Sequence, residues 1–373
     1  MKLNDFRLEV YFGKHEFSAP YLLTQSDCQS MTVKELLELA GESEEGLLGN
    51  WLGYTEVPGG TELRQEIAGL YNSIGPDGIL AHSGAQEAIF NFMNALLDRS
   101  DHVITMFPTY QSLFEIADAI GCEVDRWYLT QDQNQWTIDI DHLKRLIRPN
   151  TRLICINTPN NPTGYALTNE QMIEIAEIAD QEGIYIFSDE VYKGLELDGI
   201  EREWFADLYD KAVSLGVMSK AYGLAGLRIG WIATKDKGII EKMTKFKHYT
   251  TICNSGTSEY LATIALKNGK KILDRNLDII RKNLELSDLF FEKHRNLFQY
   301  NRPMCGPIAF HRLKSDISIN DFCDRMVEEM GILLLPAEIY DYKGNYFRMG
   351  YGRLDFENNL KRFEEYLVSK KMV

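Results

Sequence analysis

Lys220 lies in a turn of small residues, and Arg228 follows it eight positions later. A lone lysine is most often a solvated surface charge, so this segment by itself indicates little. Four upstream segments change that interpretation, because they carry the residue types that Schiff-base chemistry on a lysine requires. They are residues 83–88, 107–110, 160–164 and 188–192. Together these segments predict an enzyme in which Lys220 supplies a reactive amine.

The amine would serve pyridoxal 5'-phosphate, a cofactor with specific physical demands. Lys220 can form the Schiff base and later move a proton at the α-carbon of a substrate. Asp189 ends a short apolar run, where a buried carboxylate is costly unless it meets a cation such as a protonated pyridine nitrogen. Tyr192 and Asn161 can hydrogen-bond the phenolic oxygen of the ring. Taken alone, Asp189 and Tyr192 are more often a turn cap and a packed aromatic residue, and Asn161 part of a plain Asn-Pro turn.

A second group of residues suits the phosphate of the cofactor. Gly84, Ala85 and Gln86 precede an apolar helix, so their backbone N–H groups and the helix N-terminus favour an anion. Arg228 can add a bidentate charged contact to the same anion. Tyr110 follows a proline at the end of a strand and can lay its ring on the cofactor face. Each feature also has a common structural explanation, a helix cap for the turn and a core or rim position for the tyrosine.

Buried strands alternate with helices between residues 80 and 235. Helical patterns, at residues 87–97, 111–120 and 169–181, separate several of the strands. Such alternation predicts an α/β fold with a large domain whose mostly parallel sheet is covered by helices on both faces. The strands are indicated by short apolar runs at 102–107, 153–157, 184–188, 212–218 and 229–234.

The rest of the chain predicts a smaller α+β domain. An amphipathic stretch at 270–293 indicates one long connecting helix, and the chain closes with a helix at 356–369. Strands are expected at 308–312, 332–335 and 346–349. We expect the first 45 residues to pack on this C-terminal part. The predicted large, cofactor-binding domain is therefore 46–265, and the predicted small domain joins 1–45 to 266–373.

In their order along the chain, these motifs resemble those of the fold-type-I pyridoxal-phosphate-dependent aminotransferases of class I/II, over residues 54–348. The resemblance implies that fold, with Lys220 as the Schiff-base lysine and Asp189 as the partner of the pyridine nitrogen. It also implies Tyr110 as the stacking aromatic residue, and Tyr192 and Asn161 as partners of the ring oxygen. The positions implied around the phosphate are Gly84, Ala85, Gln86, Ser219 and Arg228.

Two further positions follow from the resemblance alone. Arg348 matches the arginine with which family members clamp the substrate α-carboxylate, a bidentate task that lysine does poorly. Tyr54 resembles the tyrosine that reaches the cofactor phosphate of a neighbouring subunit, which implies a homodimer with shared active sites. Val217 departs from the family pattern, because many relatives have Ser or Thr three residues before the lysine, so one phosphate hydroxyl is missing. Residues 19–30 match too poorly to assign substrate-pocket residues.

Composition excludes several other classes of protein. The 373 residues include 40 basic and 55 acidic side chains, a net charge of −15 that argues against nonspecific binding to nucleic acid or anionic membranes. The six cysteines form no CxxC pair, and no histidine cluster has metal-ligand spacing, so neither a disulfide framework nor a metal site is expected. The N-terminus lacks the apolar core of a signal peptide, and no stretch is long enough for a membrane span. We therefore expect a cytoplasmic protein.

The predicted function is transfer of an amino group between an L-amino acid and a 2-oxo acid. Two alternatives use the same site differently, a carbon–sulfur β-lyase and an amino-acid oxidase, since one fold hosts several chemistries. A third is a non-catalytic ligand-binding or regulatory protein, which the presence of Lys220, Asp189, Arg228 and Arg348 disfavours. The pattern does not predict the substrate side chain or the pathway.

Overall fold

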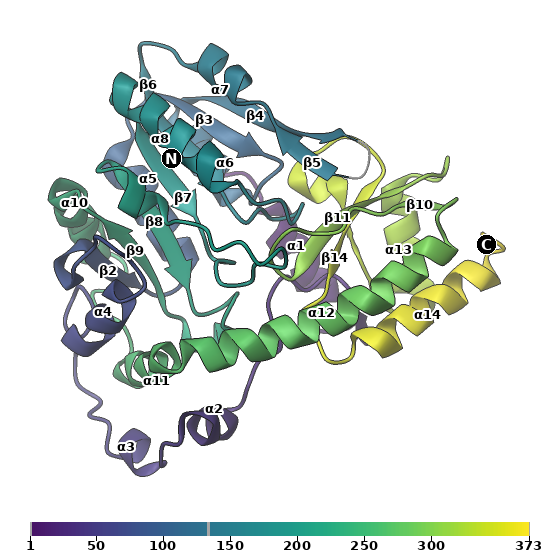
Figure 1. Cartoon of the computed structure of the whole chain (residues 1–373), viewed down its shortest axis with the longest axis horizontal. Helices are drawn as coiled ribbons and strands as arrows, with labels where there is room; N and C mark the ends of the chain where they lie inside the picture. The colour runs from purple at the N-terminus through teal and green to yellow at the C-terminus, as the bar shows by residue number, and fades with distance from the viewer. Residues whose placement is uncertain (1, 133–134, 373) are drawn as a thin grey trace.

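The computed structural model describes residues 2–132 and 135–372. Within these residues its largest feature is an eight-stranded sheet in the order β2-β9-β8-β7-β6-β3-β4-β5 (Figure 1). The five strands β4, β3, β6, β7 and β8 run parallel, whereas β9, β2 and β5 pair antiparallel. The bounds are β2 Ile79–His82, β3 His102–Phe107, β4 Glu123–Asp132, β5 Gln135–Ile138, β6 Thr151–Asn157, β7 Tyr185–Asp189, β8 Ala212–Val217 and β9 Gly230–Thr234.

The predicted α/β fold with a mostly parallel sheet is confirmed. All five strands expected from apolar runs are present, because strands buried on both faces need continuous apolar sequence. The prediction missed β4 and β5, which lie at one end of the sheet. Buried residues alternate with exposed ones in β5 and in the middle of β4, and β4 begins with exposed and half-buried residues, so neither strand has an apolar run. It also missed the short strand β2.

Helices cover both faces of this sheet because successive strand residues point to opposite sides. In β6, Ile154 and Ile156 pack on the side of α7, α8 and α9, while Leu153 and Cys155 pack on the side of α5, α6 and α10. The helices are α5 Ala85–Leu96, α6 Ser112–Ile120, α7 Ile140–Leu146, α8 Asn169–Glu182, α9 Phe205–Leu208 and α10 Lys237–Lys247.

Helix α8 shows how local sequence sets the bounds of an element. The Thr168 side chain accepts a hydrogen bond from the Gln171 N–H while the Gln171 side chain accepts from the Thr168 N–H, which satisfies two free donors of the first turn. Gly183 ends the helix with a φ of 68°, a left-handed conformation that glycine adopts without steric cost. Both caps are readable from residue type.

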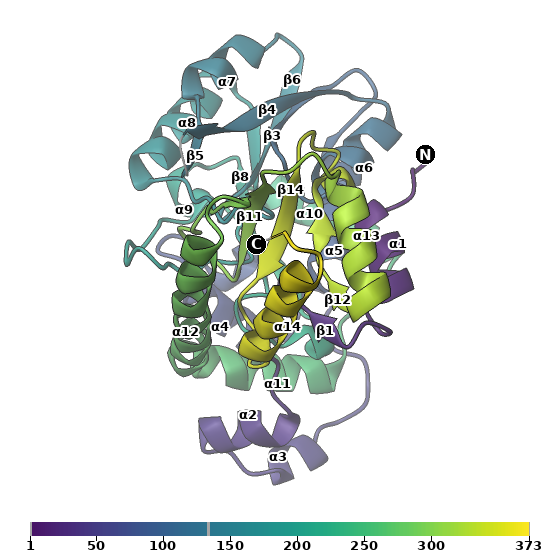
Figure 2. The same cartoon turned by 90° about the vertical axis from the view of Figure 1, so that its right-hand side faces the viewer.

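A second sheet of four antiparallel strands, in the order β10-β11-β14-β13, lies at the far end of the long helix α12 (Figure 1). Figure 2 shows α12, α13 and α14 beside it. The expected connecting and C-terminal helices are therefore present. The bounds are α12 Gly269–Lys293, β10 Phe298–Gln299, β11 Ile308–Leu313, α13 Ile319–Met330, β12 Ile332–Leu333, β13 Leu335–Pro336, β14 Tyr346–Gly350 and α14 Phe356–Ser369.

The N-terminal segment bridges the two sheets. Strand β1 pairs in parallel with β12 of the smaller part, as the expected packing on the C-terminal region requires. The backbone N–H groups of Asn4 and Arg7, however, donate to Glu115 and Gln111 of the larger part, each at 2.9 Å. The predicted domain bounds at 45 and 265 stay a prediction. The segment contains α1 Arg7–His15, β1 Tyr21–Leu22, α2 Val33–Ala40 and α3 Glu45–Leu48.

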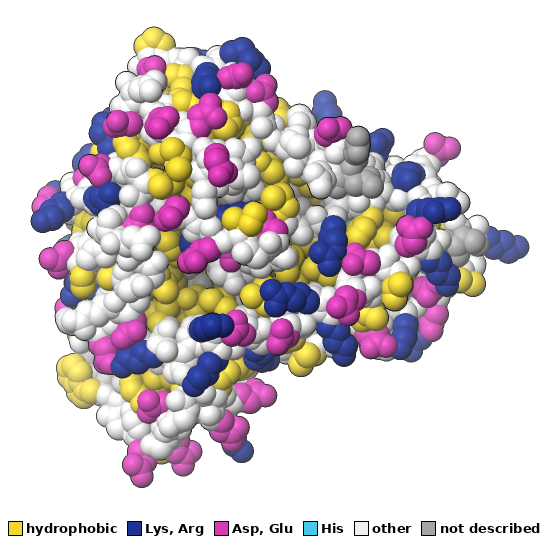
Figure 3. Space-filling view, viewed as in Figure 1, with side chains coloured by type: hydrophobic (Ala, Val, Ile, Leu, Met, Phe, Trp, Pro, Cys, Tyr) yellow, Lys and Arg dark blue, Asp and Glu magenta, His cyan; other side chains and the backbone are white. Residues whose placement is uncertain are grey.

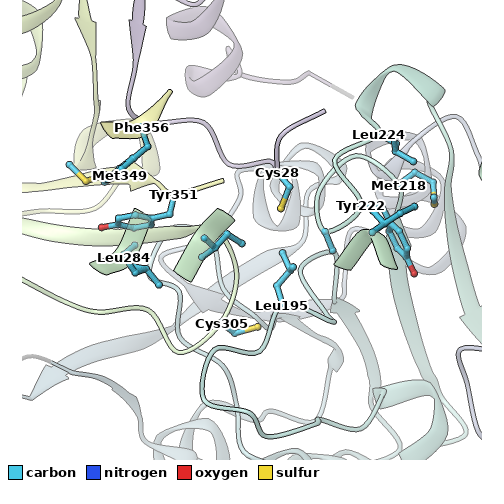
Figure 4. Packing of buried hydrophobic residues seen from close by; sticks show 14 of the residues in the cluster. Cys28, Leu195, Met218, Tyr222, Leu224, Leu284, Cys305, Met349, Tyr351 and Phe356 are labelled. Atoms are coloured by element: carbon cyan, nitrogen blue, oxygen red, sulfur yellow. The ribbon is translucent and has the colours of Figure 1, made fainter. Parts of the chain in front are cut away.

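One apolar core joins these parts of the chain. Figure 4 shows Cys28 of the N-terminal segment beside Leu195, with Leu284 of α12 and Tyr222 at either side. The remaining helices are α4 Thr61–Ala68 and α11 Gly256–Lys267, and the short 3₁₀ turns are Pro76–Gly78, Ala225–Leu227 and Ala337–Tyr340. Acidic and basic side chains are interspersed over the face in Figure 3. None of the described helices is long and apolar enough to cross a lipid bilayer.

Candidate active site

A cavity of about 470 Å³ opens at the carboxyl ends of the parallel strands. Asn157, Asp189 and Val217 line it, and they are the last residues of β6, β7 and β8. Ligands of open α/β sheets bind at this edge, where loops from several strands converge. The predicted site residues that line the cavity are Ala85, Gln86, Tyr110, Asn161, Asp189, Tyr192, Ser219, Lys220 and Arg228.

Lys220 follows the end of β8, and its Nζ donates a hydrogen bond to Ser26 Oγ at 2.9 Å. Desolvation in the cavity lowers the pKa of Lys220 below its ordinary value, although the negative field of Asp27 acts in the opposite direction. A lysine with a lowered pKa has more of its amine in the neutral, nucleophilic form. The surroundings of Lys220 therefore favour attack on a carbonyl carbon.

Asp189 is a buried carboxylate, 5% exposed, without a cation bonded to it among the described residues. Its Oδ1 accepts one weak hydrogen bond from the Val191 N–H at 3.3 Å. Burial raises the pKa of Asp189 to about 7, since desolvation outweighs this hydrogen bond and the positive charge of Lys220. A protonated pyridine nitrogen would supply the missing cation, so Asp189 fits the ring of pyridoxal 5'-phosphate.

Two further polar groups face the same space. The hydroxyl of Tyr192 is fully buried and has no hydrogen-bond partner among the described residues, which is costly unless a ligand provides one. The Oδ1 of Asn161 already accepts from Tyr340 Oη at 2.6 Å and from Arg348 Nη1 at 3.2 Å. This arrangement orients the amide so that Asn161 Nδ2 is the donor left for a ligand. Both groups fit an oxygen on the cofactor ring.

The turn before α5 forms a cradle for an anion. Gly84 has a φ of 90°, and a Cβ built on it would lie 2.5 Å from Arg228 Nη2, so glycine is required for the arginine to approach. No side chain caps α5, which leaves its first N–H groups available to a phosphate. The Gln86 side chain donates a hydrogen bond from Nε2 to Ser112 Oγ at 2.6 Å, so its backbone N–H is the group left for an anion.

Three predicted site residues, Gly84, Arg348 and Tyr54, are not among the residues that line the cavity, although Gly84 lies against the lining residue Arg228. Arg348 is fully buried behind Asn161, and its Nε and Nη2 donate to the Thr24 carbonyl at 3.1 and 2.7 Å. Tyr54 is 83% exposed on the surface of the chain. Within one chain, the structure therefore brings Arg348 next to the cavity and leaves Tyr54 outside it.

Several lining residues were not predicted. Ser26, Glu9 and Glu16 come from the N-terminal segment, about 200 residues from Lys220 in sequence, and no local motif marks them. Asn157 was within reach of prediction, because it is a polar residue at the end of an expected strand. Its Oδ1 accepts from the Asn161 N–H at 2.7 Å and its Nδ2 donates to the Asp189 carbonyl at 3.0 Å. Asn157 thus holds two predicted site residues in position.

Comparison with known proteins agrees with the cofactor that the site residues fit. The family model "Aminotransferase class I and II" matches residues 21–363. A solved PLP-dependent aminotransferase from Streptococcus suis is 32% identical, with a TM-score of 0.93 and 99% of each chain covered. An aromatic-amino-acid aminotransferase of Thermococcus litoralis is 27% identical over 345 residues, 86% of this chain and 85% of that protein. A solved PLP-dependent cyclase, OrfR, shares the fold at 24% identity, with a TM-score of 0.91 and 99% and 98% of the two chains covered.

Proposed function

The chain belongs to the class I and II aminotransferase family, and from this premise we propose that the cavity residues described above hold its cofactor and carry out transamination. The chain is a pyridoxal 5'-phosphate-dependent aminotransferase, acting on amino acids and 2-oxo acids. The observation that carries the assignment of residues is the pair Asp189 and Lys220. They supply a buried carboxylate without a cation and a desolvated amine in one cavity.

When bound, pyridoxal 5'-phosphate carries the amino group from donor to acceptor and withdraws electrons from the substrate α-carbon. Lys220 would bind the cofactor aldehyde, yield its place to the substrate amine, and then hold and return the proton at the α-carbon. Asp189 would keep the pyridine nitrogen protonated. Tyr192 and Asn161 would donate hydrogen bonds to the ring oxygen, and Tyr110 would cover the ring.

The phosphate would lie at the cradle of Gly84, Ala85 and Arg228, with Gln86 contributing its backbone and Ser219 a hydroxyl. Val217 lines the cavity and offers no hydrogen bond there. We propose that the Ser219 hydroxyl and the uncapped N–H groups of α5 replace the hydroxyl that many relatives have at that position.

A half-reaction screen tests the function. Cofactor-loaded protein is mixed with each amino acid in turn, and the absorbance of the cofactor is followed while the products are assayed. Conversion of the cofactor to its amine form, with one equivalent of 2-oxo acid released and no ammonia, supports transamination. Ammonia with pyruvate, or peroxide, would instead identify the β-lyase or the oxidase chemistry.

Arg348 is proposed to bind the substrate α-carboxylate. Arg348→Lys is expected to raise KM for the amino acid roughly 10- to 100-fold and to lower kcat, because lysine cannot reproduce a forked contact. The cofactor should remain bound, since Arg348 lies outside the phosphate cradle. Steady-state kinetics and the cofactor spectrum check both points. Arg312→Lys, at an exposed position of the neighbouring strand β11, is the matched control, and unchanged kinetics for Arg348→Lys would remove it from this role.

We also propose that two chains pair and share their active sites. Tyr54 belongs to an exposed apolar group with Leu48, Trp51 and Leu52, each more than 75% exposed, which is typical of an interaction surface. Light scattering should give twice the mass of the chain. Tyr54→Ala should weaken cofactor binding about 10-fold without changing the kcat of the loaded enzyme. Phe17→Ala, at another exposed aromatic position, is the control. A monomer in solution, or a cofactor affinity of Tyr54→Ala equal to that of the control, would contradict the proposal.

A cytoplasmic location is part of the same proposal. It is supported by the six cysteines, all of which are free, since reducing compartments keep thiols unpaired.

A further inference from the structure

The wall of the cavity formed by the N-terminal segment is acidic. Four carboxylates line the cavity, those of Glu9, Glu16, Asp27 and Asp189, against the two cations of Lys220 and Arg228. Under the proposed function, Asp189 and both cations serve the cofactor. Three carboxylates, all between residues 9 and 27, therefore line the cavity without an assigned role.

The three carboxylates differ in how far their charge is neutralised. Asp27 accepts from Arg353 Nη2 at 2.8 and 3.0 Å, so its charge is balanced within the protein. Within the part of the chain that the structure describes, the Glu16 carboxylate accepts a neutral hydrogen bond from Gln25 Nε2 at 3.0 Å and forms no ion pair. Glu9 forms no ion pair with any residue in 2–132 or 135–372. Its negative charge acts to raise the pKa of Lys220 and that of Tyr110. Glu9 and Glu16 thus present negative charge that the described residues do not balance.

The acidic and the basic residues of helix α1 lie on different faces of the helix. Glu9, Phe12 and Glu16, spaced three and four residues apart, lie on one face and line the cavity. The basic residues Arg7, Lys14 and His15 line a separate surface hollow on the other face. The acidic character of the cavity wall is therefore a property of one helix face, and the basic residues of the same helix do not neutralise it.

The cavity is a ligand site independently of these carboxylates, because the unpaired, fully buried hydroxyl of Tyr192 also lines it. We propose, on the basis of the function proposed above, that the amino donor of this enzyme carries a cationic side chain, an ammonium or a guanidinium group. Glu9 and Glu16 bind the cation, and Phe12 packs against the methylene stem. A donor with a second carboxylate meets repulsion instead, since both cations in the lining are used by the cofactor.

Pairs of amino acids that match in shape and differ in charge test this inference. With the loaded enzyme, kcat/KM in the half-reaction should be about 10-fold or more higher for arginine than for citrulline, and for lysine than for norleucine. Glu9→Gln combined with Glu16→Gln should bring both ratios close to one, chiefly by lowering kcat/KM for arginine and lysine. Glu285→Gln, on an exposed part of α12, is the control and should keep both ratios.

The outcomes separate this inference from the function on which it rests. Transfer of the amino group with equal kcat/KM for arginine and citrulline, or with a preference for aspartate or phenylalanine, overturns the cationic donor and leaves transamination intact. Binding of arginine and citrulline to the loaded enzyme is measured by calorimetry in parallel. Tighter binding of arginine without any transfer would overturn the reaction and support the charge selection by Glu9 and Glu16.

Discussion

Lys220→Ala is expected to lower the transamination rate by about 10³-fold or more, because Lys220 is proposed both to bind the cofactor covalently and to move the substrate proton. Proton transfer by a positioned side chain alone contributes about 10²- to 10⁴-fold to rate. The absorbance of the lysine-bound cofactor should disappear as well. Single-turnover kinetics and the absorption spectrum of the loaded variant measure the two effects.

Two variants show whether the loss is chemical. Lys220→Arg keeps a positive charge in the cavity and still cannot supply a reactive amine, so it should be as inactive as Lys220→Ala. Lys242→Ala removes an exposed lysine of α10 and should leave the rate unchanged. Appreciable turnover by Lys220→Ala in a buffer that contains no small amine would remove Lys220 from the mechanism.

The central strands and the residues at their carboxyl ends could be predicted from sequence for one physical reason. Strands buried on both faces require runs of apolar residues, so β6, β7 and β8 are visible without tertiary information. A polar residue that ends such a run, such as Asp189, is costly to bury and therefore informative. The parallel order of the strands then places Asp189 and Lys220 in one cavity.

The part of the cavity wall that comes from the N-terminal segment could not be predicted in this way. Glu9 and Glu16 are ordinary acidic residues of an amphipathic helix. Only tertiary contacts of α1, such as those of Arg7 with Gln111 and of Tyr11 with the Leu334 carbonyl, bring them to the cavity. Ser26 reaches Lys220 across 194 positions of sequence, a contact that no local pattern encodes. Arg348 was found through the resemblance alone, because a buried arginine in a short strand has no distinguishing neighbours in sequence.

Asp189→Asn is expected to lower kcat/KM by about 10²- to 10³-fold, the range typical of removing one preorganised electrostatic group from an active site. Asparagine is close to aspartate in size, so the cavity should keep its shape while the charge that holds a proton on the pyridine nitrogen is lost. Asp27→Asn is a matched control, because Asp27 lines the same cavity and is paired with Arg353. An effect of Asp189→Asn no larger than that of the control would contradict the assigned role.

The same substitution should change how the stability of the cofactor-free protein depends on pH. Burial raises the pKa of Asp189 from 3.8 in the unfolded chain to about 7 in the folded protein, so folding favours the protonated carboxyl. The stabilising contribution is fully present below pH 3.8, falls as pH rises, and is lost above about pH 7. Thermal unfolding should therefore show Asp189→Asn gaining stability relative to the parent between pH 5 and pH 8. Cofactor binding should abolish that gain, because the ionised Asp189 then meets a cation. A stability difference between Asp189→Asn and the parent that does not vary with pH would contradict the raised pKa.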